Sequence, residues 1–180
     1  MIGSVLIVDD DRDVLHAASF ALAREAARIE TAHAPEGLED LIAAEPFEAL
    51  LLDMNFALGE HSGQAGLDLL DRALAVDPNL SIVLMTAYGG VSLAVETLKR
   101  GAIDFVLKPW RNDRLIASVQ AAAERTRERR RQSESFDLEA AERAAIERAL
   151  AHHQANISKA AAALGLTRPA LYRRMAKHGL

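Results

Sequence analysis

The chain has 180 residues, of which 50% are apolar and 26% are charged; it contains no cysteine and carries a formal net charge of −5 at pH 7. A chain of this length can bury a sizeable core, and the lack of cysteine excludes disulfides, thiolate zinc sites and thiol nucleophiles. Without an uncharged apolar run of about 18 residues or a basic N-terminal start, we expect a cytoplasmic protein with no membrane partner.

The charge is distributed unevenly along the chain. Residues 1–123 carry 9 Lys and Arg against 19 Asp and Glu, whereas the last 25 residues carry five bases and no acid. This asymmetry predicts two modules with different partners, and an anionic partner for the C-terminal one.

Up to about residue 120, short β-rich runs alternate with stretches rich in Ala and Leu at helical spacing. The predicted strands are 5–8, 29–31, 49–52, 82–85 and 105–107. The predicted helices are 14–26, 35–44, 67–76, 91–100 and one that starts near residue 112. Five βα units in succession predict an α/β fold, a flavodoxin-like five-stranded parallel sheet with helices on both faces.

Polar residues stand at the carboxyl ends of four of these strands, and such ends meet at one edge of a parallel sheet. In chain order they are Asp9, Asp10 and Asp11 after the first strand, Asp53 after the third, Thr86 after the fourth and Lys108 after the fifth. The sequence therefore predicts an acidic pocket with a lysine and a hydroxyl beside it.

Clustered carboxylates without His or Cys suit a hard cation, Mg²⁺ above all. A carboxylate can also act as a nucleophile and become an aspartyl phosphate. Asp53, alone at the end of its strand, is the natural candidate. Lys108 would then pair with phosphoryl oxygens, and the Thr86 hydroxyl would donate to another.

These residues resemble the receiver domain of two-component response regulators. The resemblance rests on the Asp9-Asp10 pair, on Asp53, on "MTA" with Thr86 and on "FVLKPW" with Lys108, and it covers about residues 3–122. It implies a protein that receives a phosphoryl group from a sensor histidine kinase.

The resemblance also implies a role for each residue of the pocket. Asp10 and Asp53 would bind Mg²⁺ directly, Asp9 would act mainly through water, and the backbone carbonyl of Asn55 would complete the metal site. Phe105 stands where the family has its aromatic switch residue.

One segment departs from the family pattern. The sequence "DMNFALGEHSGQAGLDLL" lacks the usual Met-Pro pair and reaches its apparent Gly-x-x-Leu motif, at Gly66-Leu67, thirteen residues after Asp53. We expect a longer, mobile loop there. A subset of receivers fused to NtrC-type activators carries a similar "DMNF" insert.

An enzyme alternative rests on the same acidic run. "VDDD" also fits the strand end of haloacid-dehalogenase-type phosphatases, with Asp9 as nucleophile and Asp11 as acid/base. That chemistry needs a further acidic pair, but no acid follows Thr86 until Glu96. For Asp11 alone, a role as the N-cap of the next helix is the favoured interpretation.

Beyond the receiver-like region, residues 123–136 predict a charged linker helix. Asp137 would cap a further helix whose apolar positions, within 138–150, would serve a dimer. Asn156 and Thr167 would cap two short helices separated by a Gly-containing turn, which is typical of a helix-turn-helix.

The segment "ANISKAAAALGLTRPALYRRMAKHGL" resembles the Fis-type DNA-binding domain at the end of NtrC-class regulators, over about residues 137–180. The resemblance implies a homodimer that reads double-stranded DNA. The expected DNA-contacting residues are Lys159, Thr167, Arg168, Pro169, Ala170, Tyr172, Arg173, Arg174 and Lys177.

NtrC-class proteins normally carry an ATPase between these two modules. Here no G-x-x-x-x-G-K-[ST] motif occurs, so we expect no nucleotide partner and no enzyme activity. The sequence therefore predicts a receiver at 1–122, a linker at 123–136 and a DNA-binding domain at 137–180. The alternative is an adaptor whose Fis-like tail only dimerises or docks another protein.

Overall fold

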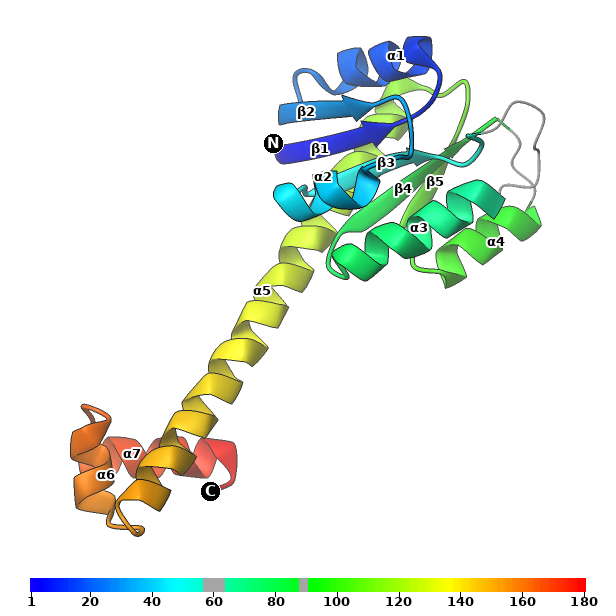
Figure 1. Ribbon diagram of the computed structural model, residues 1–180. Helices are drawn as coiled ribbons and strands as arrows, with labels where there is room; N and C mark the ends of the chain where they lie inside the picture. Colours follow the sequence, from blue (N-terminus) through cyan, green and yellow to red (C-terminus); the bar gives the residue numbers. More distant parts are fainter. Residues whose placement is uncertain (57–63, 88–90) are drawn as a thin grey trace. The chain divides into compact units, whose positions relative to one another are not determined.

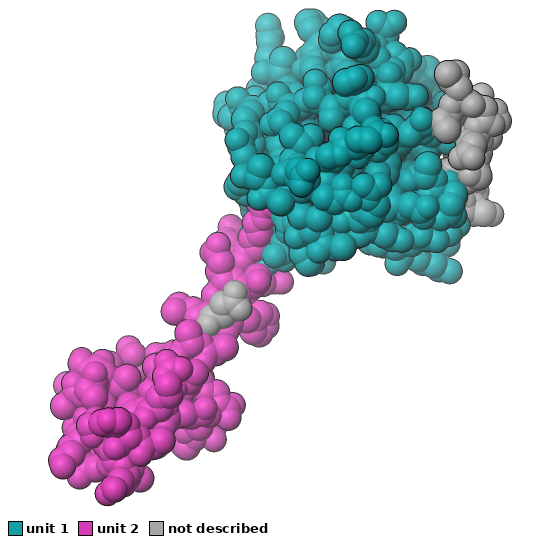
Figure 2. All heavy atoms as spheres, in the orientation of Figure 1, with its two compact units in different colours: residues 1–129 teal, residues 130–180 magenta. Residues whose placement is uncertain are grey.

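The structure is a computed structural model that describes residues 1–56, 64–87 and 91–180. The chain divides into two units, Met1–Arg129 and Arg130–Leu180, coloured teal and magenta in Figure 2. Within the described ranges, no helix is both long and apolar enough to cross a membrane.

A parallel sheet of five strands forms the centre of the first unit (Figure 1). The strands are β1 (Ile2–Val8), β2 (Ala26–Ala32), β3 (Ala49–Asp53), β4 (Ser81–Thr86) and β5 (Asp104–Leu107). Their order in the sheet, β2-β1-β3-β4-β5, is that of flavodoxin-like folds. All five predicted strands are present, and the predicted fold class is confirmed.

Helices cover both faces of this sheet. Along β3, Leu50 and Leu52 belong to one core and Ala49 and Leu51 to the other, because alternate residues of a strand point to opposite faces. The first core is closed by α2 (Leu38–Ala44) and α3 (Gln64–Val76), and the second by α1 (Arg12–Leu22) and the start of α5 (Asn112–His152). The helix α4 (Val91–Lys99) lies between β4 and β5 in the chain.

Several predicted helix boundaries were wrong by one to four residues, and two of them have a clear structural cause. The first helix ends at Leu22 rather than at Ala26, because Ala26 is the first residue of β2 and pairs with Ile2 of β1. The second begins at Leu38 rather than at residue 35. It is preceded by Gly37, whose left-handed backbone (φ +80°) cannot belong to the helix.

The helix α5 passes through position 137 without interruption, so the prediction that a helix begins at Asp137 was wrong. The physical reason is that residues 112–152 contain neither Gly nor Pro. On the first unit α5 packs beyond residue 122: Ala123 and Thr126 are fully buried, and Thr126 Oγ1 accepts a hydrogen bond of 2.8 Å from the Ser81 backbone N–H.

Replacing Thr126 with Val should destabilise the first unit by about 1–3 kcal/mol, because the buried Ser81 N–H loses its acceptor. Urea unfolding followed by the fluorescence of Trp110, the single tryptophan, would measure this. Ser81→Ala is the matched control, since among the described residues the Ser81 hydroxyl has no hydrogen-bond partner. An equal loss of unfolding free energy in both variants would show that the hydrogen bond from the Ser81 N–H to Thr126 does not stabilise the unit.

The second unit adds α6 (Ile157–Ala163) and α7 (Arg168–His178) to the end of α5. The two predicted caps are confirmed: Asn156 Oδ1 accepts from the Lys159 N–H at 3.1 Å, and Thr167 Oγ1 accepts from the Ala170 N–H at 3.4 Å. Gly165, with φ +66°, provides the turn between the two helices.

This unit has a small apolar core of its own. It is formed by Ile146, Ala160, Ala161 and Leu171, with partly buried neighbours that include Leu150. Ile146 and Leu150, which the sequence predicts on a dimer face, thus pack in this core. Leu138 remains 72% exposed.

Candidate functional site

Three carboxylates gather at the carboxyl edge of the sheet. Asp9 directly follows β1, Asp10 comes next, and Asp53 is the last residue of β3. Asp9 and Asp53 are buried, with exposed fractions of 0% and 3%, whereas Asp10 is exposed. Each of the three offers an oxygen within 4.8 Å of the others, a donor set that fits a hard divalent cation such as Mg²⁺.

Lys108 joins the two buried carboxylates of this cluster. Its Nζ donates to Asp9 Oδ2 at 2.6 Å and to Asp53 Oδ1 at 2.7 Å. Burial raises the pKa of Asp9, and the hydrogen bond from Lys108 offsets only part of this. Burial by itself would lower the pKa of Lys108, but hydrogen bonds to Asp53 and Asp9 hold it above its usual value, so the ammonium keeps its charge.

Backbone N–H groups orient the remaining oxygens of the buried acids. The Asp11 N–H donates to Asp9 Oδ1 at 3.0 Å, and the Asn55 N–H donates to Asp53 Oδ2 at 2.9 Å. The Asp11 carboxylate itself accepts from the Asp13 N–H at 2.8 Å and caps α1, as the capping alternative predicted. Asn55 therefore lies beside the carboxylate cluster, while Asp11 is the N-cap of α1.

The other predicted pocket residues lie at strand ends nearby. Thr86 ends β4, is buried, and its carbonyl accepts from the Lys108 N–H at 2.8 Å. Phe105 lies on β5 and is partly buried against the core beneath α3. The predicted mobile loop after Asp53 and the loop after Thr86 fall largely on residues 57–63 and 88–90, outside the described residues.

Gly66 was only a spacing landmark in the sequence, yet it lies against the backbone that follows Asp53. Its N–H donates to the Met54 carbonyl at 3.1 Å. A Cβ at position 66 would stand 2.4 Å from Met54 Cα and 2.8 Å from its carbonyl oxygen. Because Met54 lies between Asp53 and Asn55, Gly66 fixes the path of the chain through the candidate site. The Gly-x-x-Leu pattern was the feature of the sequence that could have indicated this close approach.

The residues expected to contact DNA are spread over the second unit. Lys159 on α6 and Tyr172 and Arg173 on α7 are exposed. The other expected contacts also belong to α7 or its cap; Thr167, Arg168 and Pro169 are exposed and Ala170 is half-buried. Arg174 and Lys177 instead pair with acids of α5, which the sequence reasoning did not single out.

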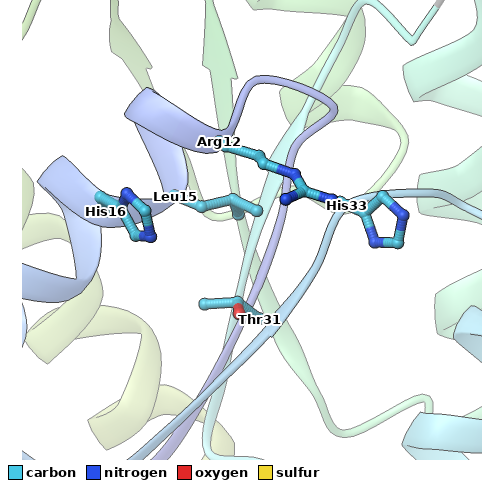
Figure 3. A pocket seen from close by; sticks show the side chains of 5 residues that line it. All are labelled: Arg12, Leu15, His16, Thr31 and His33. Carbon is cyan, nitrogen blue, oxygen red and sulfur yellow. The ribbon is translucent and has the colours of Figure 1, made fainter.

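A separate hollow of about 220 Å³ lies between α1 and β2 (Figure 3). It is lined by Arg12, Leu15, His16, Thr31 and His33, and in Figure 3 the guanidinium of Arg12 extends toward His33. Among the lining residues only Leu15 is buried, and none belongs to the acidic cluster. The candidate site therefore remains the cluster at Asp53.

Comparisons with known protein families match two stretches of the chain. The response regulator receiver domain family matches residues 5–120, and the Fis family of bacterial regulatory proteins matches residues 137–178. Only residues 121–136 separate the two matches.

Curated relatives match mainly over the first of these stretches. The nitrogen assimilation regulatory protein NtrX of Azorhizobium caulinodans is 34% identical over 130 residues, 72% of this chain and 28% of that protein. The transcriptional regulatory protein FixJ of Bradyrhizobium diazoefficiens is 30% identical over 120 residues, 67% of this chain and 56% of that protein. The chain thus spans less than two thirds of either relative.

Solved structures agree with these matches. The N-terminal receiver domain of a two-component response regulator from Bacteroides fragilis has a TM-score of 0.61 and 36% identity, covering 68% of this chain and 98% of that one. NtrX from Brucella abortus has a TM-score of 0.64 and 30% identity; the match covers 74% of this chain and 29% of that one.

Proposed function

Since this chain belongs to the response regulator receiver family and continues into a Fis-family helix-turn-helix, we propose that phosphorylation of Asp53 by a sensor histidine kinase controls its binding to DNA and thereby transcription. The observation that carries the proposal is the buried carboxylate of Asp53, 2.7 Å from the Lys108 ammonium and within reach of two further acids. We propose that the protein is cytoplasmic, where it would bind DNA.

In this proposal an Asp53 carboxylate oxygen is the nucleophile. It forms a bond to phosphorus while the bond from phosphorus to the kinase histidine nitrogen breaks, and the imidazole leaves with the electron pair and takes up a proton. Lys108, whose ammonium already reaches Asp53, would then pair with a phosphoryl oxygen. The Thr86 hydroxyl would donate to another.

The residues of the acidic edge fit Mg²⁺. Asp10, Asp53 and the Asn55 carbonyl would hold it directly, and Asp9 would hold it through water. When bound, Mg²⁺ neutralises negative charge on the phosphoryl oxygens during transfer. Asp9 also keeps Lys108 in position through its 2.6 Å hydrogen bond.

Phosphorylation would act as a local charge change that biases a two-state element. Thr86 and Lys108 would close on the phosphoryl group, and Phe105 would change its packing. The resulting dimer would bring two reading helices onto one DNA site, which raises affinity without new contacts. We propose residues 1–122 as the receiver, 123–136 as the linker and 137–180 as the DNA-binding domain.

The test is affinity selection of fragmented genomic DNA by the purified chain, with Mg²⁺ and acetyl phosphate, beside the Asp53→Ala variant. We expect enrichment of a two-fold symmetric site that weakens in the variant. Equal enrichment by both proteins would retain DNA binding but remove the control by Asp53. Failure to enrich any site would refute the DNA-binding proposal.

A second candidate function is an adaptor whose Fis-like tail mediates dimerisation rather than DNA reading. It is favoured by the exposed Leu138 and by the acids of α5 that neutralise two bases of α7. Binding to DNA that weakens steeply with salt would argue against this alternative.

A further inference from the structure

The five bases of the last 25 residues fall into two groups. Arg174 Nη1 lies 3.0 Å from Glu142 Oε1, and Lys177 Nζ lies 2.9 Å from Glu139 Oε1. The other three, here called the open bases, are Lys159, Arg168 and Arg173. They are exposed and form no ion pair with any side chain that the structure describes.

Glu142 holds a second side chain of α7. His178, whose side chain is 7% exposed, lies with its Nε2 2.9 Å from Glu142 Oε2, close enough for the ring N–H to donate. The hydrogen bond from His178 and the charge of Arg174 lower the pKa of Glu142, and the hydrogen bond to Glu139 raises the pKa of Lys177. Glu142 and Lys177 therefore stay charged near neutral pH.

Helix geometry places the paired residues together. Arg174, Lys177 and His178 are spaced by three and four residues, so they share one side of α7, the side that meets α5. Tyr172 is 51% exposed, and Arg173 is exposed and forms no ion pair with a side chain that the structure describes. The three residues of α7 with Glu139 and Glu142 are called the α7 clamp.

A base that is paired with an acid adds little to DNA binding. Moving its charge to a phosphate breaks the ion pair and leaves a carboxylate close to the negatively charged backbone. The open bases carry no such cost, because no described acid competes for them.

We propose that the α7 clamp positions the reading helix against α5, and that the open bases, together with Tyr172, make the DNA contacts. This inference rests on the DNA-binding function proposed above. It separates the basic residues predicted to contact DNA into those that do so and those that position α7. Arg174, Lys177 and His178 become positioning residues.

The adjacent arginines give a matched pair for the test. Binding of the full chain to a labelled mixed-sequence duplex would be measured over a range of salt concentrations. Arg173→Gln should make the slope of log affinity against log salt shallower by about 0.9, the change for one lost phosphate contact. Arg174→Gln should leave this slope unchanged. Arg174→Gln should instead speed amide hydrogen exchange in α7, a readout that Arg173→Gln should not move.

Removing an acid of the clamp tests the same proposal in the opposite direction. Glu142→Gln frees Arg174, so the salt slope should become steeper and affinity should rise several-fold at low salt, while α7 exchanges faster. Glu147→Gln is the control, because Glu147 lies on the same helix but pairs with Arg143, 2.9 Å away.

The outcomes separate the clamp from the function on which it rests. A slope change for Arg174→Gln equal to that for Arg173→Gln would overturn the division of roles, as would an unchanged slope and exchange rate in Glu142→Gln. If the unaltered chain shows no salt-dependent binding, the DNA-binding function fails and the contact assignment fails with it. Faster exchange in Arg174→Gln and Glu142→Gln would then still identify the clamp as a structural device.

Discussion

Asp53→Asn should abolish phosphoryl uptake from acetyl phosphate, while the chain remains folded. Asn keeps the shape of the side chain and can still accept from Lys108, but it lacks the anionic oxygen that must attack phosphorus. Intact-protein mass spectrometry would measure the uptake.

The controls for this prediction separate the nucleophile from the metal ligands. Asp40→Asn removes an exposed carboxylate of α2 and should leave uptake unchanged. Asp10→Asn should slow uptake. It should also reduce the rise in thermal midpoint that Mg²⁺ produces. For the unaltered chain, Mg²⁺ at 100 times its dissociation constant should stabilise the fold by about 2.7 kcal/mol. Loss of uptake in Asp9→Asn with full uptake in Asp53→Asn would support the phosphatase-type alternative instead.

The positions of the strands could be predicted because apolar β-rich runs alternate regularly with helical stretches. The boundary at Ala26 could not, because "ALAREAAR" consists of helix-forming residues on both sides of it. The helix already ends at Leu22, and Ala26 pairs with Ile2, a contact between segments distant in sequence. Asp137 looked like a cap, but capping is only a local preference and the helix runs through it.

The candidate site was predictable to the extent that it follows from topology. The meeting of Asp9, Asp53 and Lys108 follows from the rule that carboxyl ends of parallel strands share an edge. Their hydrogen bonds also explain how adjacent acids are tolerated after β1: the Lys108 ammonium compensates the buried Asp9, and Asp11 is used as a helix cap. The exposed Asp10 stays in contact with solvent.

The contacts between helices were not predictable in this way. Glu142 and Glu139 appear in the sequence as ordinary surface acids of a charged helix. Their pairing with Arg174 and Lys177 depends on how α6 and α7 fold back on α5 through the core at Ile146. Residue type and spacing identified the bases but not their partners.

Gly66→Ala should both destabilise the first unit and slow phosphorylation of Asp53. The added Cβ would lie 2.4 Å from Met54 Cα, and a backbone atom cannot move aside as the end of a flexible side chain can. Overpacking of this kind costs about 1–3 kcal/mol. Because the displaced residue lies between Asp53 and Asn55, the Asp53 carboxylate that we propose as phosphoryl acceptor and the Asn55 carbonyl would shift together. A displacement near 1 Å would lower the rate on the order of a hundredfold.

The loss of stability and the loss of rate can be measured separately. Initial rates of uptake from acetyl phosphate, measured with Mg²⁺ well below the thermal midpoint of the variant, report the geometry of the site alone. Ala75→Ser, at an exposed position of α3, should change neither rate nor midpoint. A normal rate in Gly66→Ala with a lowered midpoint would make Gly66 a packing residue only. A reduced rate in the folded variant would show that the approach of α3 to Met54 holds the phosphorylation site in its reactive arrangement.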